Sequence, residues 1–116
     1  MTLHFSYGSN MNRAMMRVHA PGAQALGVAR LDAHRFIVTS DGYASVVPAP
    51  GQVVHGVLWR LTPRDRVTLD AWENVAATLY RCETVLVQVQ GRRMPALVYF
   101  ARPRREAGPS LVTWNW

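Results

Sequence analysis

Apolar and polar residues alternate over several short stretches of this chain, and glycine, proline, asparagine or aspartate residues separate these stretches. The alternation predicts strands, because successive side chains of a strand point to opposite faces. We expect about six strands, at residues 4–7, 25–39, 43–47, 53–61, 79–90 and 94–101. The run from Pro48 to Gly51 predicts a turn that pairs 43–47 with 53–61, and Gln90 to Arg93 predict a hairpin turn.

The stretch 79–90 changes character along its length. Val85 and Val89 share a face, but the same parity upstream carries Arg81 and Glu83. We therefore expect the buried face to switch near Thr84, as a bend or bulge would cause.

Two further segments predict short helices. Residues 13–18 follow possible side-chain caps and end before Pro21-Gly22. In the second segment Thr62 can cap the helix, Pro63 occupies its first position, and Asp65 stands three residues after the cap. This helix is expected to end near Asn74.

The order of these elements predicts an α+β domain with a largely antiparallel sheet or barrel. The chain has 116 residues, 49% of them hydrophobic and 17% charged, which fits one globular domain. We expect a single domain over 1–116, with its core at about 3–101 and an irregular tail at 102–116.

Cellular location follows from features that the sequence lacks. A single cysteine, Cys82, excludes an internal disulfide framework and a cysteine-based zinc site. No stretch approaches the ~18 apolar residues of a membrane helix, and Met1 to Asn10 lack the features of a signal peptide. We predict a cytoplasmic domain without a membrane partner.

Thirteen basic residues, all arginine, face seven acidic ones and give a formal charge of +6. Binding of polyanions, attraction of small anionic substrates and a bias of the source genome all explain such an excess. The arginines are scattered, and the complete lack of lysine favours genomic bias. Without an RNP-like motif or a zinc finger, we predict no nucleic-acid partner.

Familiar catalytic motifs do not occur either. The sequence has no Gly-x-Ser-x-Gly elbow, Walker loop or dinucleotide fingerprint. Its four histidines, at 4, 19, 34 and 55, lack metal-ligand spacing. An enzyme built from this chain is expected to use no metal, cofactor or nucleophile triad.

One segment that stands apart is Tyr7-Gly8-Ser9-Asn10, where a strand runs into a helix. A tight turn at Gly8 lets consecutive backbone N–H groups converge on a small carboxylate. The alternative interpretation is a turn followed by a helix cap.

The other is Glu73, near the predicted end of the second helix. The negative end of the helix dipole raises the pKa of a carboxyl group there, which suits a residue that accepts and then releases a proton. The alternative is a glutamate that simply faces solvent. Asp70 is interpreted as a helix-surface or capping acid.

Both segments belong to a longer set of matching residues: Phe5 to Met11, Gly56 to Leu61, Leu69-Asp70 with Glu73, and Tyr80-Arg81. In order and spacing the set resembles the γ-glutamylcyclotransferase family from residue 5 to about residue 100. Tyr-Gly-Ser-Asn near the N-terminus is fairly specific, and its combination with a later Leu-Asp-x-x-Glu is strong.

The resemblance implies a small mixed β-barrel, largely antiparallel and flanked by short helices. It implies that the loop from Tyr7 to Asn10 holds a γ-glutamyl group largely through backbone N–H groups. Glu73 would be the acid–base residue, and Tyr80 would lie in the pocket. The implied partner is a small γ-glutamyl substrate, which releases an amine as it closes to 5-oxoproline.

Two departures from the family leave alternatives open. Asn74 stands where the family usually has glycine after the glutamate, and the chain ends soon after Ala101. A catalytically idle module that binds a small carboxylate is therefore the alternative function. Trp114 and Trp116 would pack over the barrel or close a subunit contact, so we expect a monomer or a homodimer.

Overall fold

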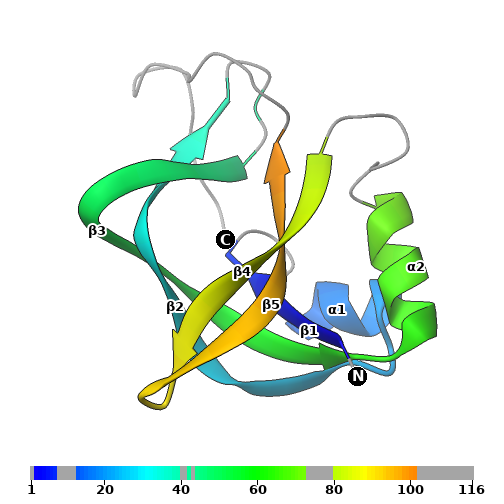
Figure 1. The fold of residues 1–116 in the computed structure, drawn as a ribbon. Coiled ribbons are helices and arrows are strands. Elements are labelled where there is room, and N and C mark those ends of the chain that lie inside the picture. Colours follow the sequence, from blue (N-terminus) through cyan, green and yellow to red (C-terminus); the bar gives the residue numbers. More distant parts are fainter. Residues whose placement is uncertain (1, 8–12, 40–41, 43, 73–79, 102–116) are drawn as a thin grey trace.

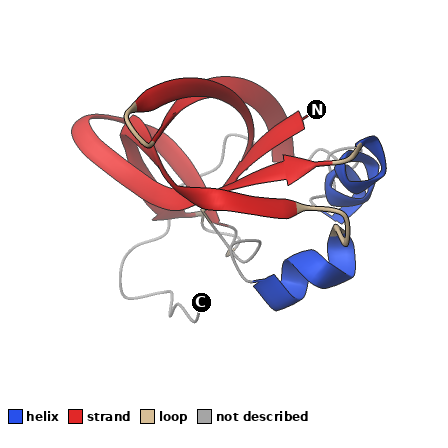
Figure 2. Ribbon diagram, turned by 90° about the horizontal axis from the view of Figure 1, so that it is seen from below, coloured by secondary structure: helices blue, strands red, loops and turns tan. Residues whose placement is uncertain are grey.

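Five strands close into a barrel, and two helices pack against one side of it (Figures 1 and 2). The computed structural model describes residues 2–7, 13–39, 42, 44–72 and 80–101. The strands are β1 (Thr2–Ser6), β2 (Gln24–Val38), β3 (Ala44–Leu61), β4 (Tyr80–Val89) and β5 (Arg92–Ala101), and the helices are α1 (Arg13–His19) and α2 (Pro63–Trp72). The tail expected to be irregular, residues 102–116, lies outside the described residues.

The strand order is β1-β3-β2-β4-β5, and β1 pairs with β5 to complete the circle. The β1–β5 pair is parallel, and the other four pairs are antiparallel. The barrel is thus mixed and largely antiparallel, which confirms the fold class predicted from the sequence.

The predicted turn at Pro48 to Gly51 is wrong. Residues 44–61 form one long strand, β3, which pairs with β2 on both sides of these residues. Between the pairs His34↔Pro48 and Asp32↔Val53, the single residue Ala33 lies opposite residues 49–52. The two prolines and the left-handed Gly51 (φ 80°) therefore form a bulge, which bends the strand instead of reversing it.

The turn between β4 and β5 is as predicted. Gln90 and Gly91 both have positive φ, at 50° and 76°, which is the conformation of a tight two-residue hairpin turn. The pairing of β4 with β5 runs without a register shift from Tyr80↔Ala101 to Val89↔Arg92.

Apolar side chains form two clusters separated by the barrel wall. The interior cluster includes Phe5, Leu58 and Val98, all buried. The second lies between the barrel and the helices and includes Met16, Trp59 and Leu69.

The start of α2 is fixed as its sequence predicts. The Asp65 carboxylate accepts a hydrogen bond from the Thr62 backbone N–H at 3.0 Å, and the Thr62 hydroxyl accepts one from the Asp65 N–H at 3.1 Å. Asp65 also accepts the backbone N–H of Gly22 at 3.1 Å. One buried carboxylate therefore holds α2 against the segment that joins α1 to β2.

No helix among the described residues has the length and apolar character needed to cross a membrane.

Candidate active site

Several strand ends lie together at one end of the barrel. The parallel pair His4↔Leu97 brings the end of β1 beside the end of β5, and the pair Tyr80↔Ala101 places the start of β4 there too. The Tyr80 hydroxyl donates a hydrogen bond to the carbonyl of Ala44, at the start of β3, at 3.0 Å. The structure therefore brings Tyr7 and Tyr80 to the same end of the molecule.

Tyr7 is part of the barrel core. Its side chain is 7% exposed, its ring packs edge-on against Phe36 at 6.2 Å, and its hydroxyl donates to the backbone carbonyl of Tyr99. Tyr7 is therefore a fixed anchor for the residues that follow it. Those residues, Gly8, Ser9 and Asn10, lie outside the described part of the chain.

Tyr80 opens β4 and packs against the cluster under the helices. It follows the segment 73–79, which contains Glu73 and also lies outside the described residues. The acid–base assignment of Glu73 therefore stays a prediction.

A cavity of about 410 Å³ opens between the far part of the β2–β3 pair and the β4–β5 hairpin. Its wall includes Thr39, Ser45, Arg81, Glu83, Val85 and Phe100. Two of these residues adjoin the predicted site, since Ser45 follows Ala44, the partner of Tyr80, and Phe100 lies on the strand beside Tyr7. The volume is within the range of small-molecule sites.

The cavity wall carries one pair of opposite charges that sequence analysis did not place in the site. Arg81 and Glu83 form an ion pair, and the Arg81 guanidinium lies over the ring of Phe100 at 4.6 Å. Arg81 and Glu83 line the same cavity as Val85, and the β4–β5 register is continuous. The expected switch of the packed face is confirmed, since Tyr80 and Cys82 pack against the cluster under the helices whereas Val87 and Val89 belong to the interior cluster. The bend or bulge expected near Thr84 is wrong, because the register of β4 with β5 has no shift.

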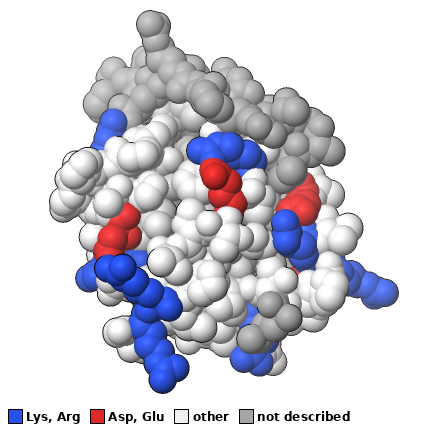
Figure 3. All heavy atoms as spheres, in the orientation of Figure 1, with Lys and Arg blue, Asp and Glu red and all other residues white. Residues whose placement is uncertain are grey.

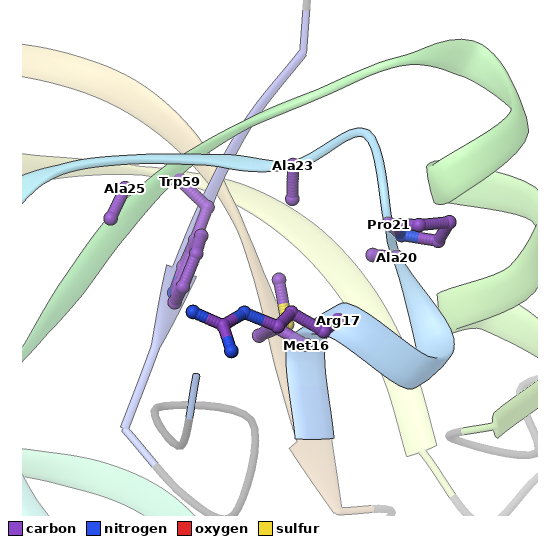
Figure 4. A pocket seen from close by; sticks show the side chains of 7 residues that line it. All are labelled: Met16, Arg17, Ala20, Pro21, Ala23, Ala25 and Trp59. Carbon is purple, nitrogen blue, oxygen red and sulfur yellow. The ribbon is translucent and has the colours of Figure 1, made fainter. Parts of the chain in front are cut away.

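A second pocket, of about 160 Å³, lies between α1 and strands β2 and β3 (Figure 4). Met16, Ala20 and Trp59 form its apolar wall, and the side chain of Arg17 extends toward the ring of Trp59. A cavity of roughly this volume holds a ligand about the size of benzene. The larger cavity is therefore the better candidate for a γ-glutamyl compound.

Cationic side chains occupy several separate places on the face in Figure 3, some of them beside acidic side chains. In the described part of the chain, ion pairs join Arg30 to Asp32, Arg66 to Asp70 and Arg81 to Glu83. This distribution agrees with the scatter in the sequence. The expected lack of a nucleic-acid partner stays a prediction. Within the described ranges no three or more His, Cys, Asp or Glu residues are grouped to hold a metal ion.

His4 lies on β1 and is fully buried. Its ring packs edge-on against the ring of Tyr99, with the ring centroids 5.4 Å apart. Burial lowers the pKa of His4 from 6.5 to about 4, although a hydrogen bond with the Leu97 backbone opposes the shift. Arg66 lowers this pKa further and Asp70 raises it; both residues lie on α2.

We expect the domain to lose about 2 kcal/mol of stability between pH 7 and pH 5 because of His4. The unfolded chain binds a proton near pH 6.5 and the folded chain only near 4, so protonation favours unfolding as the pH falls through this range. Urea unfolding at the two pH values measures the loss. His4→Gln should abolish most of it, and His55→Gln, at an exposed position, should not; equal pH dependence in all three proteins would contradict the prediction.

Comparison with known proteins gives consistent matches. A family model described as "Gamma-glutamyl cyclotransferase, AIG2-like" matches residues 4–116. The γ-glutamylcyclotransferase of Homo sapiens is 28% identical over 119 residues, which cover 93% of this chain and 63% of that protein. The Bos taurus protein of the same name is 31% identical over 98 residues, which cover 76% and 52%. The chain thus spans less than two thirds of the curated relatives it matches.

Solved structures give the same answer for the fold. A structure titled "Gamma-glutamyl cyclotransferase" superimposes with a TM-score of 0.84 at 27% identity, over 90% of this chain and 69% of that one. An AIG2-like protein from Mus musculus superimposes with a TM-score of 0.72 at 20% identity, over 99% and 95%. At 20% identity the second comparison concerns the fold alone.

Proposed function

The chain belongs to the γ-glutamyl cyclotransferase, AIG2-like family, and from that membership we propose that it releases an amine or amino acid from a γ-glutamyl compound with formation of 5-oxoproline. The observation that carries the proposal is the family match over residues 4–116, which includes both predicted site segments. The position of Tyr7 and Tyr80 at the same end of the barrel, and a cavity of suitable volume in the barrel wall, support it.

The proposed reaction needs no nucleophile from the enzyme, because the α-amino group of the substrate attacks its own γ-carbonyl carbon. A C–N bond forms within the new five-membered ring, and the C–N bond to the leaving amine breaks. Glu73 takes a proton from the α-ammonium group, which frees the attacking lone pair, and later gives this proton to the departing amine. The second proton, which the ring nitrogen loses after its attack, passes to the same amine, so that the leaving group departs as an ammonium ion. No metal or activated water enters this balance.

The protein's other contribution is to hold the substrate bent for ring closure, which removes part of the entropic barrier. We propose that backbone N–H groups between Tyr7 and Asn10 bind the substrate's α-carboxylate or the developing oxyanion. Tyr80 lies at the same end of the barrel and would border the bound γ-glutamyl group. The cavity lined by Arg81 and Glu83 would receive the leaving amine.

The test is a screen of γ-glutamyl amines and γ-glutamyl amino acids with detection of 5-oxoproline. Release of 5-oxoproline by the native protein supports the proposal. Binding of these compounds without any turnover would instead identify a carboxylate-binding module.

The larger cavity, lined by Val85, gives a separate prediction about substrate binding. We expect Val85→Trp to raise KM about tenfold or more, because Val85 lines the cavity and an indole there would occupy part of its volume. Steady-state kinetics on the best substrate of the screen measures the change. Leu86→Trp is the matched control, since Leu86 is the next residue of β4, is 58% exposed and does not line the cavity. Equal KM values for the two variants would place the substrate elsewhere.

A further inference from the structure

Tyr99, on β5, contacts Tyr7 and Asp70, two residues that lie close in sequence to the segments assigned the proposed chemistry. Its backbone carbonyl accepts the hydrogen bond of the Tyr7 hydroxyl, and its own hydroxyl donates to Oδ1 of Asp70 at 2.5 Å. Tyr7 directly precedes the loop of Gly8, Ser9 and Asn10. Asp70 lies on α2, three residues before Glu73. A single residue of the barrel wall thus joins the start of the substrate-binding loop to the helix that leads to the acid–base glutamate.

Burial of Tyr99 and the charge of Asp70 both strengthen the hydrogen bond between these two side chains. Tyr99 is 3% exposed, so its side chain is held almost entirely within the protein. Burial, together with the hydrogen bond to Asp70, raises the pKa of Tyr99 far above its usual range, and the hydroxyl therefore remains a donor. Arg66, one turn earlier on α2, lies 3.4 Å from the other oxygen of Asp70. The carboxylate is thus held from two sides, and hydrogen bonds to a charged acceptor are the stronger kind.

The position of α2 depends on contacts with the barrel such as the Tyr99–Asp70 hydrogen bond. This helix has ten residues, and a helix of this length is marginal in isolation, so its position depends on contacts with the barrel. The capping contacts of Asp65 hold its first turn. Near its other end, Leu69 is buried in the cluster under the helices, and Asp70 makes the hydrogen bond to the barrel wall.

We propose that Tyr99 is a positioning residue that holds Tyr7 and the last turn of α2 at a fixed separation and so acts on the reaction through these two segments; this inference rests on the proposed function. Its hydroxyl fixes the last turn of α2, and its carbonyl fixes Tyr7. Because a displacement of about 1 Å at a reacting group can lower a rate about a hundredfold, the hydroxyl of Tyr99 should affect kcat without contact with the substrate.

The experiment compares Tyr99→Phe with the native protein by steady-state kinetics. Tyr99→Phe keeps the ring and the carbonyl but loses the hydrogen bond to Asp70. We expect kcat to fall roughly 10- to 100-fold with KM changed less than threefold. Asp70→Asn retains an oxygen that accepts the Tyr99 hydroxyl, so its loss of kcat should be smaller. The double variant should lose less than the product of the two single losses, because both changes act on the same hydrogen bond.

Two further measurements separate positioning from general destabilisation. Val98→Ala is the matched control: Val98 is the neighbouring residue of β5, is fully buried in the barrel interior, and belongs to neither segment. It should lower the melting temperature while kcat stays native. Amide hydrogen exchange should accelerate at residues 69–72 in Tyr99→Phe but not at 65–66, which the cap holds.

The outcomes distinguish this inference from the proposed function. Native kcat in Tyr99→Phe, from a protein that turns over, would overturn the role of Tyr99 and leave the proposed function intact. If the native protein releases no 5-oxoproline from any substrate, the proposed function fails. Hydrogen exchange then decides separately: unchanged exchange at 69–72 overturns the anchoring of α2 by Tyr99, and faster exchange supports it.

Discussion

Glu73→Gln is expected to lower kcat by about 10² to 10⁴-fold, the usual contribution of a positioned general acid–base residue. The amide has nearly the same size as the carboxylate, but it cannot take a proton from the substrate's α-ammonium group. KM should change little, because binding is assigned to backbone groups of the loop after Tyr7. The measurement is 5-oxoproline release at saturating substrate, with the melting temperature recorded for each protein.

Glu73→Asp is the informative companion to this variant. It retains the carboxylate but shortens the side chain by one methylene group, so part of the activity should remain. The order native, Glu73→Asp, Glu73→Gln supports proton transfer by this residue. Native activity in Glu73→Gln would show that another group moves the proton, and the assignment from the resemblance would be wrong.

The sequence predicts those parts of the fold that depend on neighbouring residues. The cap of α2 is an example, because Thr62 and Asp65 satisfy each other's backbone N–H groups within one turn. The turn at Gln90-Gly91 is another. The run from Pro48 to Gly51 misled the prediction because proline and glycine mark a bulge as readily as a reversal. Pairing with β2 on both sides makes it a bulge, and residues 48–51 alone do not specify this pairing.

In the candidate site, too, features set by neighbouring residues can be predicted from the sequence, whereas contacts between separate elements cannot. Tyr7 follows from the sequence pattern and Tyr80 from the family resemblance, and the barrel register brings both residues to one end of the molecule. The role of Asp70 as a hydrogen-bond acceptor was missed, since its partner Tyr99 lies 29 residues away and no local pattern marks the pair. Arg81 and Glu83 left a signal in the broken alternation of β4, and the structure explains it: β4 packs against the cluster under the helices through Tyr80 and Cys82 and against the interior cluster through Val87 and Val89.

We expect Gly56→Ala to destabilise the domain by about 3 kcal/mol or more, at or above the upper end of ordinary overpacking. A Cβ atom at Gly56 would collide with the backbone carbonyl oxygen of Ser6 and lie 2.9 Å from the Phe5 ring. Both residues belong to β1, and the Ser6 side chain is itself held by Trp59 at 2.9 Å. Since the blocking atom is backbone, relief requires β1 to move away from β3. Urea unfolding at neutral pH measures the change.

Gly51→Ala separates this steric effect from the general consequences of replacing a glycine. Gly51 has a positive φ of 80°, and a Cβ atom added there would meet no other atom within 4 Å, so its replacement should cost about 1–2 kcal/mol of backbone strain alone. At Gly56, alanine would on its own stabilise an extended strand by about 0.5–1 kcal/mol, because glycine loses more entropy on folding. The sign of the change in unfolding free energy caused by Gly56→Ala therefore tells whether the steric contact or the chain entropy dominates. Destabilisation shows that β1 must approach β3 this closely, which is the contact that fixes the strand leading into Tyr7 and its loop; a neutral or stabilising change would show that β1 shifts freely.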